Sequence, residues 1–408
     1  MMEGRVVIAG GGHAGGAVCA ALRQFGWKGP ITIVGAEKLP PYQRPPLSKD
    51  WLKGLASAES LALRPPRFYA DRDIVLRLDT GVTVIDRQAG QVTTSEGDAL
   101  PYDHLILALG ARARRIDLPG IDLSGVLELR TADDADQLKL ALAPGRHLAV
   151  IGGGYIGLEA AASARVLGAE ATIIEREGRV LARVACPELS AFFHATHVAR
   201  GVRVELGASV TALEGENGAV RGVRLADGRR IACDAALIGV GAVPNIELAA
   251  AAGLDCGNGI VVDLSGRTSD PAISAIGDCS WRPLPLYGRS FRLESVPNAL
   301  EQARQVAASL CGRPAPNPEV PWFWSDQYDV KLQIAGLAFD VPITVMRGDP
   351  ATDSFAMFHL TADHRVQAVE AVNAAPEFMA GRQMIAKRKP IAPDDLRDLS
   401  LSLKDLAA

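Results

Sequence analysis

Two glycine-rich turns with the spacing G-x-G-x-x-G constrain this chain most strongly, at residues 10–15 and 152–157. Each turn follows a short apolar run, residues 6–9 and 148–151, and each opens an alanine-rich stretch that predicts a helix. The first glycine of such a turn permits a tight bend, the second lets backbone approach a pyrophosphate, and the third brings helix close to strand. One copy is a weak signal among 41 glycines, but two copies in one context predict two dinucleotide-binding units. Their glycines are Gly10, Gly12 and Gly15, then Gly152, Gly154 and Gly157.

The composition is that of an ordinary soluble globular protein. At 408 residues, with 48% hydrophobic and 22% charged residues, the chain has room for two or three domains. A net charge of -4 carries no signature of nucleic-acid binding. No apolar run approaches the ~20 residues needed to cross a bilayer, and no signal sequence precedes the first strand. We therefore expect a cytoplasmic protein with neither a nucleic-acid nor a membrane partner.

The six cysteines are isolated, with no C-x-x-C pair and no metal-ligand spacing. Flavoproteins that reduce disulfides need two thiols in exchange geometry, so this pattern argues against that chemistry. Cys279 follows Gly277 and Asp278 directly, which leaves two interpretations open. The thiol either lies beside a cofactor or is simply buried, and the second interpretation is favoured.

The order of motifs predicts one nucleotide-binding domain inserted within another. Apolar strands that end in glycine close the units near residues 105–110 and 235–241, and a further strand ends at Asp278. After Pro321 the pattern changes to alternating apolar positions and a helix following Pro376. The predicted fold class is α/β, with two Rossmann-like FAD- and NAD-binding domains and a C-terminal α+β domain. The predicted boundaries are 1–110 with 240–320, then 111–239, then 321–408.

Acidic residues after the second strand of each unit indicate how a ribose is bound. Glu175 lies 18 residues past Gly157, close to the ~20 expected for a carboxylate that accepts a ribose 2′-hydroxyl. A 2′-phosphate would be repelled there, so NADH is favoured over NADPH, although Arg176 and Arg179 soften that preference. The alternative is an exposed strand-end glutamate. In the first unit Glu37 comes late, and both a ribose contact and a solvated turn residue stay open.

Several motifs together resemble the oxygenase-coupled NADH-dependent ferredoxin reductases. The early ones are residues 10–15, the run Arg-Pro-Pro-Leu-Ser-Lys at 44–49, and residues 151–159. The later ones are residues 276–279, 294–304 and 321–328. This resemblance implies the glutathione-reductase-like fold, with a discontinuous FAD domain, an inserted NAD domain and a C-terminal interface domain. The chain departs from the family at Leu109, where a threonine is common.

The resemblance also implies which residues bind each cofactor. The first turn takes FAD and the second takes NADH. The implied FAD contacts outside the glycines are Ala14, Ala36, Arg44, Lys49, Val82, Arg130, Asp278 and Val296. The implied NADH contacts are Gly152, Gly154, Gly157 and Glu175.

For the reaction, the resemblance implies an electron splitter. A flavin accepts a hydride and returns electrons singly, as an iron-sulfur cluster requires. Lys49 and Glu159 would form a catalytic ion pair beside the flavin N5; the alternative is a loop lysine and a surface glutamate that never meet. Trp324 would pack near the flavin ring as the exit for electrons, or would serve only as aromatic packing.

The implied electron acceptor is a [2Fe-2S] ferredoxin that serves a cytochrome P450 or a Rieske oxygenase. Arg304 matches a docking position of the family, and the ferredoxin would dock near Arg304 and Trp324. The basic run at residues 387–389 is either a second docking cluster or a solvated helix end, and the second is favoured. Three other functions stay open: an NADH oxidase or peroxidase, a rubredoxin reductase, and a flavin-based redox-sensing protein.

Overall fold

A computed structural model describes residues 3–408, and the chain divides into two compact units. Among these residues, the first unit holds 3–43, 58–112 and 243–323, and the second holds 44–57, 113–242 and 324–408. Each unit contains one of the two glycine-rich turns. The strands β8 (Ala111–Ala113) and β17 (Ala242–Pro244) lie where the chain passes from one unit to the other.

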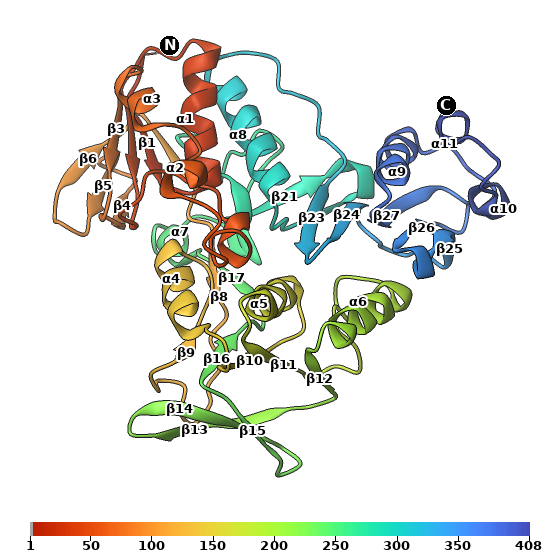
Figure 1. Ribbon diagram of the computed structural model, residues 1–408. Helices are drawn as coiled ribbons and strands as arrows, with labels where there is room; N and C mark the ends of the chain where they lie inside the picture. Colours follow the sequence, from red (N-terminus) through yellow and green to blue (C-terminus); the bar gives the residue numbers. More distant parts are fainter. Residues whose placement is uncertain (1–2) are drawn as a thin grey trace. The chain divides into compact units, whose positions relative to one another are not determined.

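A five-stranded parallel sheet in the order β20-β7-β1-β2-β3 forms the centre of the first unit (Figure 1). All four residues of β1 are buried, as expected of a parallel strand that is covered on both faces. The strands are β1 (Val6–Ala9), β2 (Ile31–Val34), β3 (Ile74–Arg77), β7 (His104–Leu107) and β20 (Ile273–Ala275).

Two long helices, α1 (His13–Phe25) and α8 (Val296–Leu310), pack side by side in the first unit (Figure 1). Buried apolar side chains from both helices and from β1 form one core cluster, which includes Val18, Leu22 and Val306. α1 ends at Gly26, whose φ of 97° is a left-handed conformation that favours glycine.

The rest of the first unit is made of short elements. They form one antiparallel sheet in the order β4-β5-β6 and another sheet in the order β18-β19-β21-β22. The elements are α2 (Ala58–Leu61), α3 (Pro66–Ala70), β4 (Val82–Asp86), β5 (Gln91–Thr94), β6 (Ala99–Pro101), α7 (Glu247–Ala251), β18 (Cys256–Gly257), β19 (Gly259–Val261), the 3-10 turn η2 (Gly277–Cys279), β21 (Ser280–Leu284), η3 (Pro285–Tyr287) and β22 (Arg289–Phe291).

The second unit has its own five-stranded parallel sheet, in the order β12-β11-β10-β16-β9. Its core includes Val150, Ile173 and Leu237 from the strands and Leu158 from α5. The elements are the 3-10 turn η1 (Pro45–Ser48), β9 (Val126–Leu127), α4 (Ala132–Ala141), β10 (His147–Ile151), α5 (Tyr155–Val166), β11 (Glu170–Glu175), α6 (Pro187–Ala199), β12 (Arg203–Leu206) and β16 (Ala235–Ile238).

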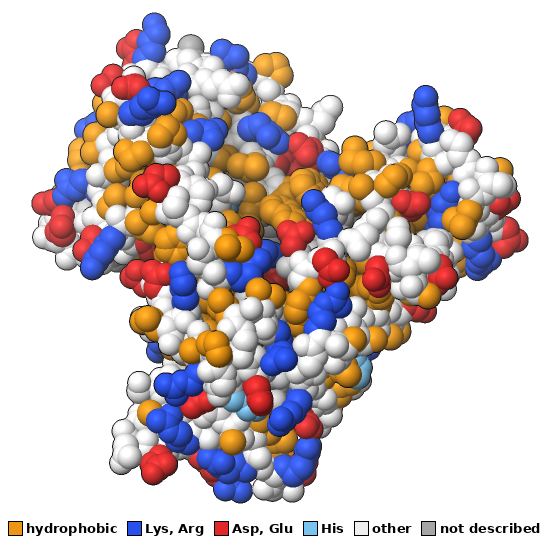
Figure 2. Space-filling model, in the orientation of Figure 1, with side chains coloured by type: hydrophobic (Ala, Val, Ile, Leu, Met, Phe, Trp, Pro, Cys, Tyr) orange, Lys and Arg blue, Asp and Glu red, His pale blue; other side chains and the backbone are white. Residues whose placement is uncertain are grey.

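A small antiparallel sheet of β13 (Val210–Glu216), β14 (Ala219–Leu225) and β15 (Arg230–Ala232) extends the second unit. Its arginines are paired with acids: Arg224 and Arg230 both contact the carboxylate of Glu214. Figure 2 shows the same mixing of Lys and Arg with Asp and Glu over the face that it draws.

The C-terminal part of the chain forms a five-stranded sheet in the order β23-β24-β27-β26-β25, with three helices. Helix α9 begins next to Pro376, as the sequence predicted, and packs on β27. The elements are β23 (Trp322–Gln327), β24 (Val330–Gly336), β25 (Ile343–Asp349), η4 (Pro350–Thr352), β26 (Ser354–Leu360), β27 (Val366–Val372), α9 (Ala375–Lys387), α10 (Pro393–Arg397) and α11 (Leu403–Leu406).

The predicted fold class, two Rossmann-like units with a C-terminal sheet domain, is confirmed by these sheets and by the comparisons reported below.

The basic run at 387–389 ends α9, and two of its lysines donate to C-terminal carbonyls: Lys387 to Ala407 and Lys389 to Ala408. No helix within residues 3–408 has the length and apolar character needed to cross a membrane.

Candidate functional site

The first glycine-rich turn is a backbone cradle at the N-terminus of α1. A Cβ added to Gly10, whose φ is +119°, would lie 2.1 Å from the carbonyl oxygen of Ala108. A Cβ added to Gly15 would lie 2.1 Å from the carbonyl oxygen of Gly10. The N-cap residue Gly12 supplies no capping side chain, and the first turn of α1 holds no acid. Backbone N–H groups therefore face a site suited to a pyrophosphate, which is what FAD would place there.

Five other predicted FAD residues lie in the first unit. Ala36 is exposed just after β2, and Val82 is the half-buried first residue of β4. Asp278 lies in η2 directly after β20, and Val296 is the first residue of α8. Ala14 is buried in the first turn of α1, where its Cβ would approach a substituent on Gly277 at 3.1 Å.

A buried polar network that the sequence reading did not assign holds the segment containing Asp278. Gln302 Oε1 accepts hydrogen bonds from the Gly277 N–H at 2.8 Å and the Ser280 hydroxyl at 2.9 Å. It also accepts from Asn298 Nδ2 at 3.2 Å. The network ties η2 to α8, so it fixes the backbone on both sides of Asp278.

A buried ion pair completes this network. Arg282 Nη2 lies 2.8 Å from Glu301 Oε1, and Arg282 Nη1 donates to Asn298 Oδ1 at 3.0 Å. Both charged side chains are almost fully buried, and such a pair requires close geometry because desolvation opposes it. The sequence indicates Asn298, Glu301 and Gln302 only as members of the family motif at residues 294–304.

Cys279 is a buried thiol, the interpretation favoured from the sequence. Its side chain is fully buried and its Sγ lies 3.3 Å from the carbonyl oxygen of Ile276. Burial raises the pKa of this thiol to about 11, which keeps it protonated and unreactive. All six cysteines are free, so within residues 3–408 there is no disulfide pair beside either turn.

The second glycine-rich turn has the same backbone form at the N-terminus of α5. Gly152 has a φ of +109°, and its added Cβ would lie 2.5 Å from the carbonyl oxygen of Gly239. An added Cβ on Gly157 would lie 2.3 Å from the carbonyl oxygen of Gly152. Gly154 is the N-cap and again supplies no side chain. This end of α5 is suited to a second pyrophosphate.

Glu175 lies at the end of β11 against this second turn. Its Oε2 accepts the Gly153 N–H at 2.6 Å, and its Oε1 accepts the Glu177 N–H at 2.8 Å. The carboxylate is thus held beside the middle of the glycine-rich turn. That placement fits the predicted role at a ribose hydroxyl, and it excludes the alternative of a strand-end glutamate that is merely solvated.

The predicted ion pair between Lys49 and Glu159 is present in the second unit. Lys49 Nζ lies 2.6 Å from Glu159 Oε2, with the Glu159 side chain 4% exposed and that of Lys49 15% exposed. The alternative in which the two residues never meet is therefore wrong. Lys49 follows η1, and Glu159 lies in α5, two residues past the last glycine of the turn.

Two serines that the sequence reading missed hold both oxygens of the Glu159 carboxylate. The Ser48 hydroxyl donates to Oε2 at 2.5 Å, and the Ser325 hydroxyl donates to Oε1 at 2.6 Å. Both serines are buried. Ser48 and Ser325 are the chain neighbours of the predicted site residues Lys49 and Trp324. Their place in the same family motifs is the one feature of the sequence that could have identified them.

A chain of hydrogen bonds continues from Ser325 into α6. Gln327 Nε2 donates to the Ser325 Oγ at 3.2 Å, and His197 Nε2 lies 2.9 Å from Gln327 Oε1. Burial lowers the pKa of His197 to about 4, so the imidazole is neutral at pH 7. With Gln327 accepting through Oε1, His197 donates from Nε2, and every donor in the chain points toward Glu159.

Two arginines predicted near the FAD phosphates lie together in the second unit. Arg44 Nη1 donates to the carbonyl oxygen of Arg130 at 2.6 Å. The backbone N–H of Arg130 in turn donates to Asp134 Oδ2 at 3.0 Å, next to the capping box that Thr131 and Asp134 form on α4. The Arg130 segment is therefore anchored at a helix N-terminus.

Of the two predicted docking residues, Arg304 is exposed on α8 and Trp324 is half-buried in β23. Arg304 Nη2 lies 2.8 Å from Glu319 Oε1, and both side chains are close to half exposed. An ion pair so exposed contributes little to stability, so the guanidinium can exchange partners at small cost.

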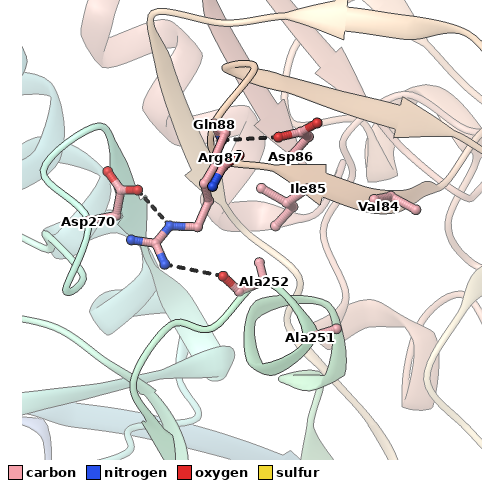
Figure 3. Close-up of a pocket in the computed structure, with 8 residues that line it drawn as sticks. All are labelled: Val84, Ile85, Asp86, Arg87, Gln88, Ala251, Ala252 and Asp270. Atoms are coloured by element: carbon pink, nitrogen blue, oxygen red, sulfur yellow. Dashed lines mark hydrogen bonds and ion pairs between the residues drawn. The ribbon is translucent and has the colours of Figure 1, made fainter.

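An open pocket of about 630 Å³ lies elsewhere in the first unit, between the end of β4 and the end of α7 (Figure 3). Its central side chain, Arg87, is already satisfied: Nε donates to Asp270 Oδ2 at 2.7 Å and Nη1 donates to the Ala252 carbonyl at 3.2 Å. None of the predicted cofactor residues lines this pocket.

Comparison with known proteins agrees with this geometry. A family model described as pyridine nucleotide-disulphide oxidoreductase matches residues 4–303, and one described as reductase C-terminal matches residues 322–407. The chain is 50% identical over 404 residues to a probable ferredoxin reductase of Castellaniella defragrans, covering 99% of this chain and 98% of that protein.

The likeness extends to a solved complex. The chain is 44% identical over 408 residues to putidaredoxin reductase of Pseudomonas putida, covering 99% of this chain and 96% of that protein. It matches the reductase in a covalent putidaredoxin reductase–putidaredoxin complex with a TM-score of 0.96 and 43% identity, covering 99% and 98% of the two chains. The resemblance carried by the sequence motifs is thereby confirmed. The chain belongs to the pyridine nucleotide-disulphide oxidoreductase family and, within it, to the ferredoxin reductases, flavoproteins that bind FAD and use NAD(P)H.

Proposed function

We propose that this protein takes electrons from NADH through FAD and passes them one at a time to a [2Fe-2S] ferredoxin, which serves a cytochrome P450 or a Rieske oxygenase. The observation that carries the proposal is the buried pair of Lys49 and Glu159 beside the second of two glycine-rich cradles. Relatives named putidaredoxin reductase, rhodocoxin reductase and ferredoxin reductase of an anthranilate dioxygenase system support it. When bound, FAD supplies the chemistry of accepting a hydride and returning single electrons.

The predicted domain arrangement follows from this function. Residues 1–110 with 240–320 would bind FAD, residues 111–239 would bind NADH, and residues 321–408 would form an interface domain. The first cradle would hold the FAD pyrophosphate on the N–H groups at the start of α1, with Ala36, Val82, Asp278 and Val296 along the cofactor. The protein would act in the cytoplasm, and its six free cysteines and the use of NADH support that location.

Lys49 and Glu159 would act as a fixed charge pair at the flavin N5. Glu159 accepts from Ser48 and Ser325 on opposite oxygens, so its carboxylate cannot rotate without breaking a buried hydrogen bond. The carboxylate in turn fixes the Lys49 ammonium, which also lies 3.1 Å from the carbonyl oxygen of Pro45. The ammonium also donates to the Ser48 hydroxyl oxygen at 3.5 Å, so three contacts fix the position of the charge before a cofactor binds.

Glu175 would select NADH. A carboxylate already fixed by two backbone N–H groups keeps its negative charge beside the cradle, and a 2′-phosphate would meet that charge at short range. The ribose 2′-hydroxyl of NADH instead donates a hydrogen bond to it.

Ferredoxin would dock near Arg304 and Trp324. Such proteins are usually acidic, and Arg304 can leave its exposed partner Glu319 for an acidic side chain of the partner protein. Arg304→Ala should slow ferredoxin reduction several-fold and flatten its decline with ionic strength. Arg313→Ala, an exposed arginine of the same unit, is the matched control. A rate of ferredoxin reduction that changes neither with ionic strength nor in Arg304→Ala would rule out this docking site.

The decisive experiment is anaerobic. The FAD-loaded protein is reduced with one equivalent of NADH and mixed rapidly with a [2Fe-2S] ferredoxin, while cluster and flavin absorbance are followed. Fast cluster reduction with matching flavin reoxidation is expected. In separate mixings the same reduced protein meets O2, H2O2 or rubredoxin in place of the ferredoxin. Fast reoxidation by O2 or H2O2 alone would favour the oxidase or peroxidase, fast transfer to rubredoxin alone would favour a rubredoxin reductase, and slow transfer to every acceptor would favour a redox sensor.

A further inference from the structure

A cysteine, a histidine and a glutamate meet in the second unit, near Tyr155 at the start of α5. They are Cys186 at the N-cap of α6, His359 on β26 and Glu370 on β27. One ligand atom from each side chain lies within 4.8 Å of the others. His359 and Glu370 are both about 95% buried, at 4% and 5% exposed, and Cys186 is half-buried.

The imidazole of His359 lacks the partner that a buried polar atom ordinarily has. Its Nε2 makes no hydrogen bond although it lies 3.3 Å from Glu370 Oε2. Its Nδ1 lies 3.4 Å from the hydroxyl of Thr344, which orients the ring. Buried ring nitrogens ordinarily have a hydrogen-bond partner. A metal ion bound between His359 Nε2, the carboxylate and the thiol would supply the missing partner.

The spacing fits a tetrahedral ion. Nitrogen and oxygen ligands about 2.0–2.1 Å from Zn²⁺ lie about 3.4 Å apart, close to the separation of His359 Nε2 and Glu370 Oε2. The Cys186 sulfur lies within 4.8 Å of both of these atoms. The carboxylate is already oriented, because both of its oxygens lie 3.2 Å from the Cys186 backbone N–H.

We infer that Cys186, His359 and Glu370 bind a thiophilic divalent cation, with Zn²⁺ the best match, and leave its fourth position to water. A thiolate, a neutral imidazole and a carboxylate are the ligand set that favours Zn²⁺ over Mg²⁺ or Ca²⁺. The charges of two anionic ligands and the ion cancel, and the proton displaced from the Cys186 thiol leaves to solvent. The ion would join the N-terminus of α6 to the sheet of β26 and β27, which makes it a structural clamp.

Neighbouring groups support the clamp. The segment before Cys186 is held by Arg179, which donates to the carbonyl oxygens of Ala182 and Ala185 at 2.8 Å each. Arg179 also donates to the Ser190 hydroxyl at 2.6 Å on α6. The thiol is therefore presented by a backbone that is already fixed.

The test is a titration of the chelator-treated FAD-loaded protein with Co²⁺ and then Zn²⁺. One equivalent of Co²⁺ should give a thiolate charge-transfer band and tetrahedral visible bands, and Zn²⁺ should displace it and raise the midpoint of thermal unfolding. Cys186→Ala should abolish the charge-transfer band, and His359→Asn should weaken binding at least tenfold. Cys256→Ala, the other partly exposed cysteine, is the matched control and should bind normally.

These readouts do not depend on electron transfer to ferredoxin, so this inference and the proposed function fail separately. Failure of the native protein to bind either ion would overturn the inference and leave His359 and Glu370 as a buried ion pair. Binding that survives Cys186→Ala and disappears in Cys256→Ala would also overturn it. Substitution of Glu370 would also remove its hydrogen bond from the backbone at the start of α6, so Cys186 and His359 are the informative positions.

Discussion

The two glycine-rich turns have nearly the same backbone structure, and they differ in the side chains beside them. In both, the first glycine has a positive φ, and a Cβ on the third glycine would clash with a carbonyl oxygen of the turn. In the second, Glu175 accepts a hydrogen bond from the turn itself. In the first, Glu37 instead accepts from the Tyr42 hydroxyl at 2.5 Å. Under the proposed function, the two cradles would bind the pyrophosphate that both cofactors share, and residues after the second strand of each unit would distinguish the cofactors.

The largest effect should come from filling either cradle. Gly15→Ala places a Cβ 2.1 Å from a carbonyl oxygen, so the protein should purify with at least about tenfold less FAD, read from its visible absorption. Gly157→Ala, with the same conflict at 2.3 Å, should retain FAD and raise the KM for NADH instead. Loss of FAD from both variants alike would mean that the two turns are not assigned to separate cofactors.

The next effect concerns the charge pair that only the second turn possesses. Lys49→Met strands a buried carboxylate, which should cost roughly 3 kcal/mol of stability and slow flavin reduction by NADH at least about tenfold. Adding Glu159→Gln should recover part of the thermal midpoint. Lys53→Met, whose partner Asp50 is exposed, is the control and should change neither quantity. An unchanged reduction rate in Lys49→Met would remove the pair from the reaction.

Acid should destabilise the second unit more than the first. Buried His197 stays neutral to about pH 4, whereas the unfolded chain takes up a proton near pH 6.5, so stability falls as pH drops below that value. Between pH 7 and pH 5 the loss should be about 2 kcal/mol, visible as a lower midpoint of thermal unfolding. His197→Gln should flatten this slope, and His104→Gln in the half-buried site of the first unit should flatten it less.

The smallest of these effects is on coenzyme choice. Glu175→Ala should raise kcat/KM for NADPH about tenfold relative to NADH, since it removes a charge that repels the 2′-phosphate. Adding Glu177→Arg should raise it further. Glu37→Ala is the matched change beside the first turn and should leave the NADH to NADPH ratio as it was. A ratio that moves with Glu37 and not with Glu175 would reverse the assignment.

Much of this architecture could be predicted from local sequence. The apolar strand and the glycine spacing lie within one strand–turn–helix unit, and Glu175 ends the next strand along the chain. The helices extend beyond the alanine-rich runs that predicted them, because α1 continues to the left-handed Gly26 and α5 begins at Tyr155.

The partners of the site residues could not be predicted in the same way. Ser48 and Ser325 lie 111 and 166 positions from Glu159, so no periodicity links them. Gln302 and Arg282 are polar residues whose burial follows only once α8 is packed on α1. A motif can name such residues, but their hydrogen bonds are set by tertiary packing.

Helix α8 has consequences for how new electron partners can arise. Its inward residues Asn298, Glu301 and Gln302 are committed to the buried network beside Asp278. Its outward residues Leu300 and Arg304 are exposed and support nothing in the core. Substitutions at the outward positions of α8, in evolution or in engineering for a foreign electron carrier, can therefore change the surface offered to a partner. The buried network that holds the segment of Asp278 would stay the same.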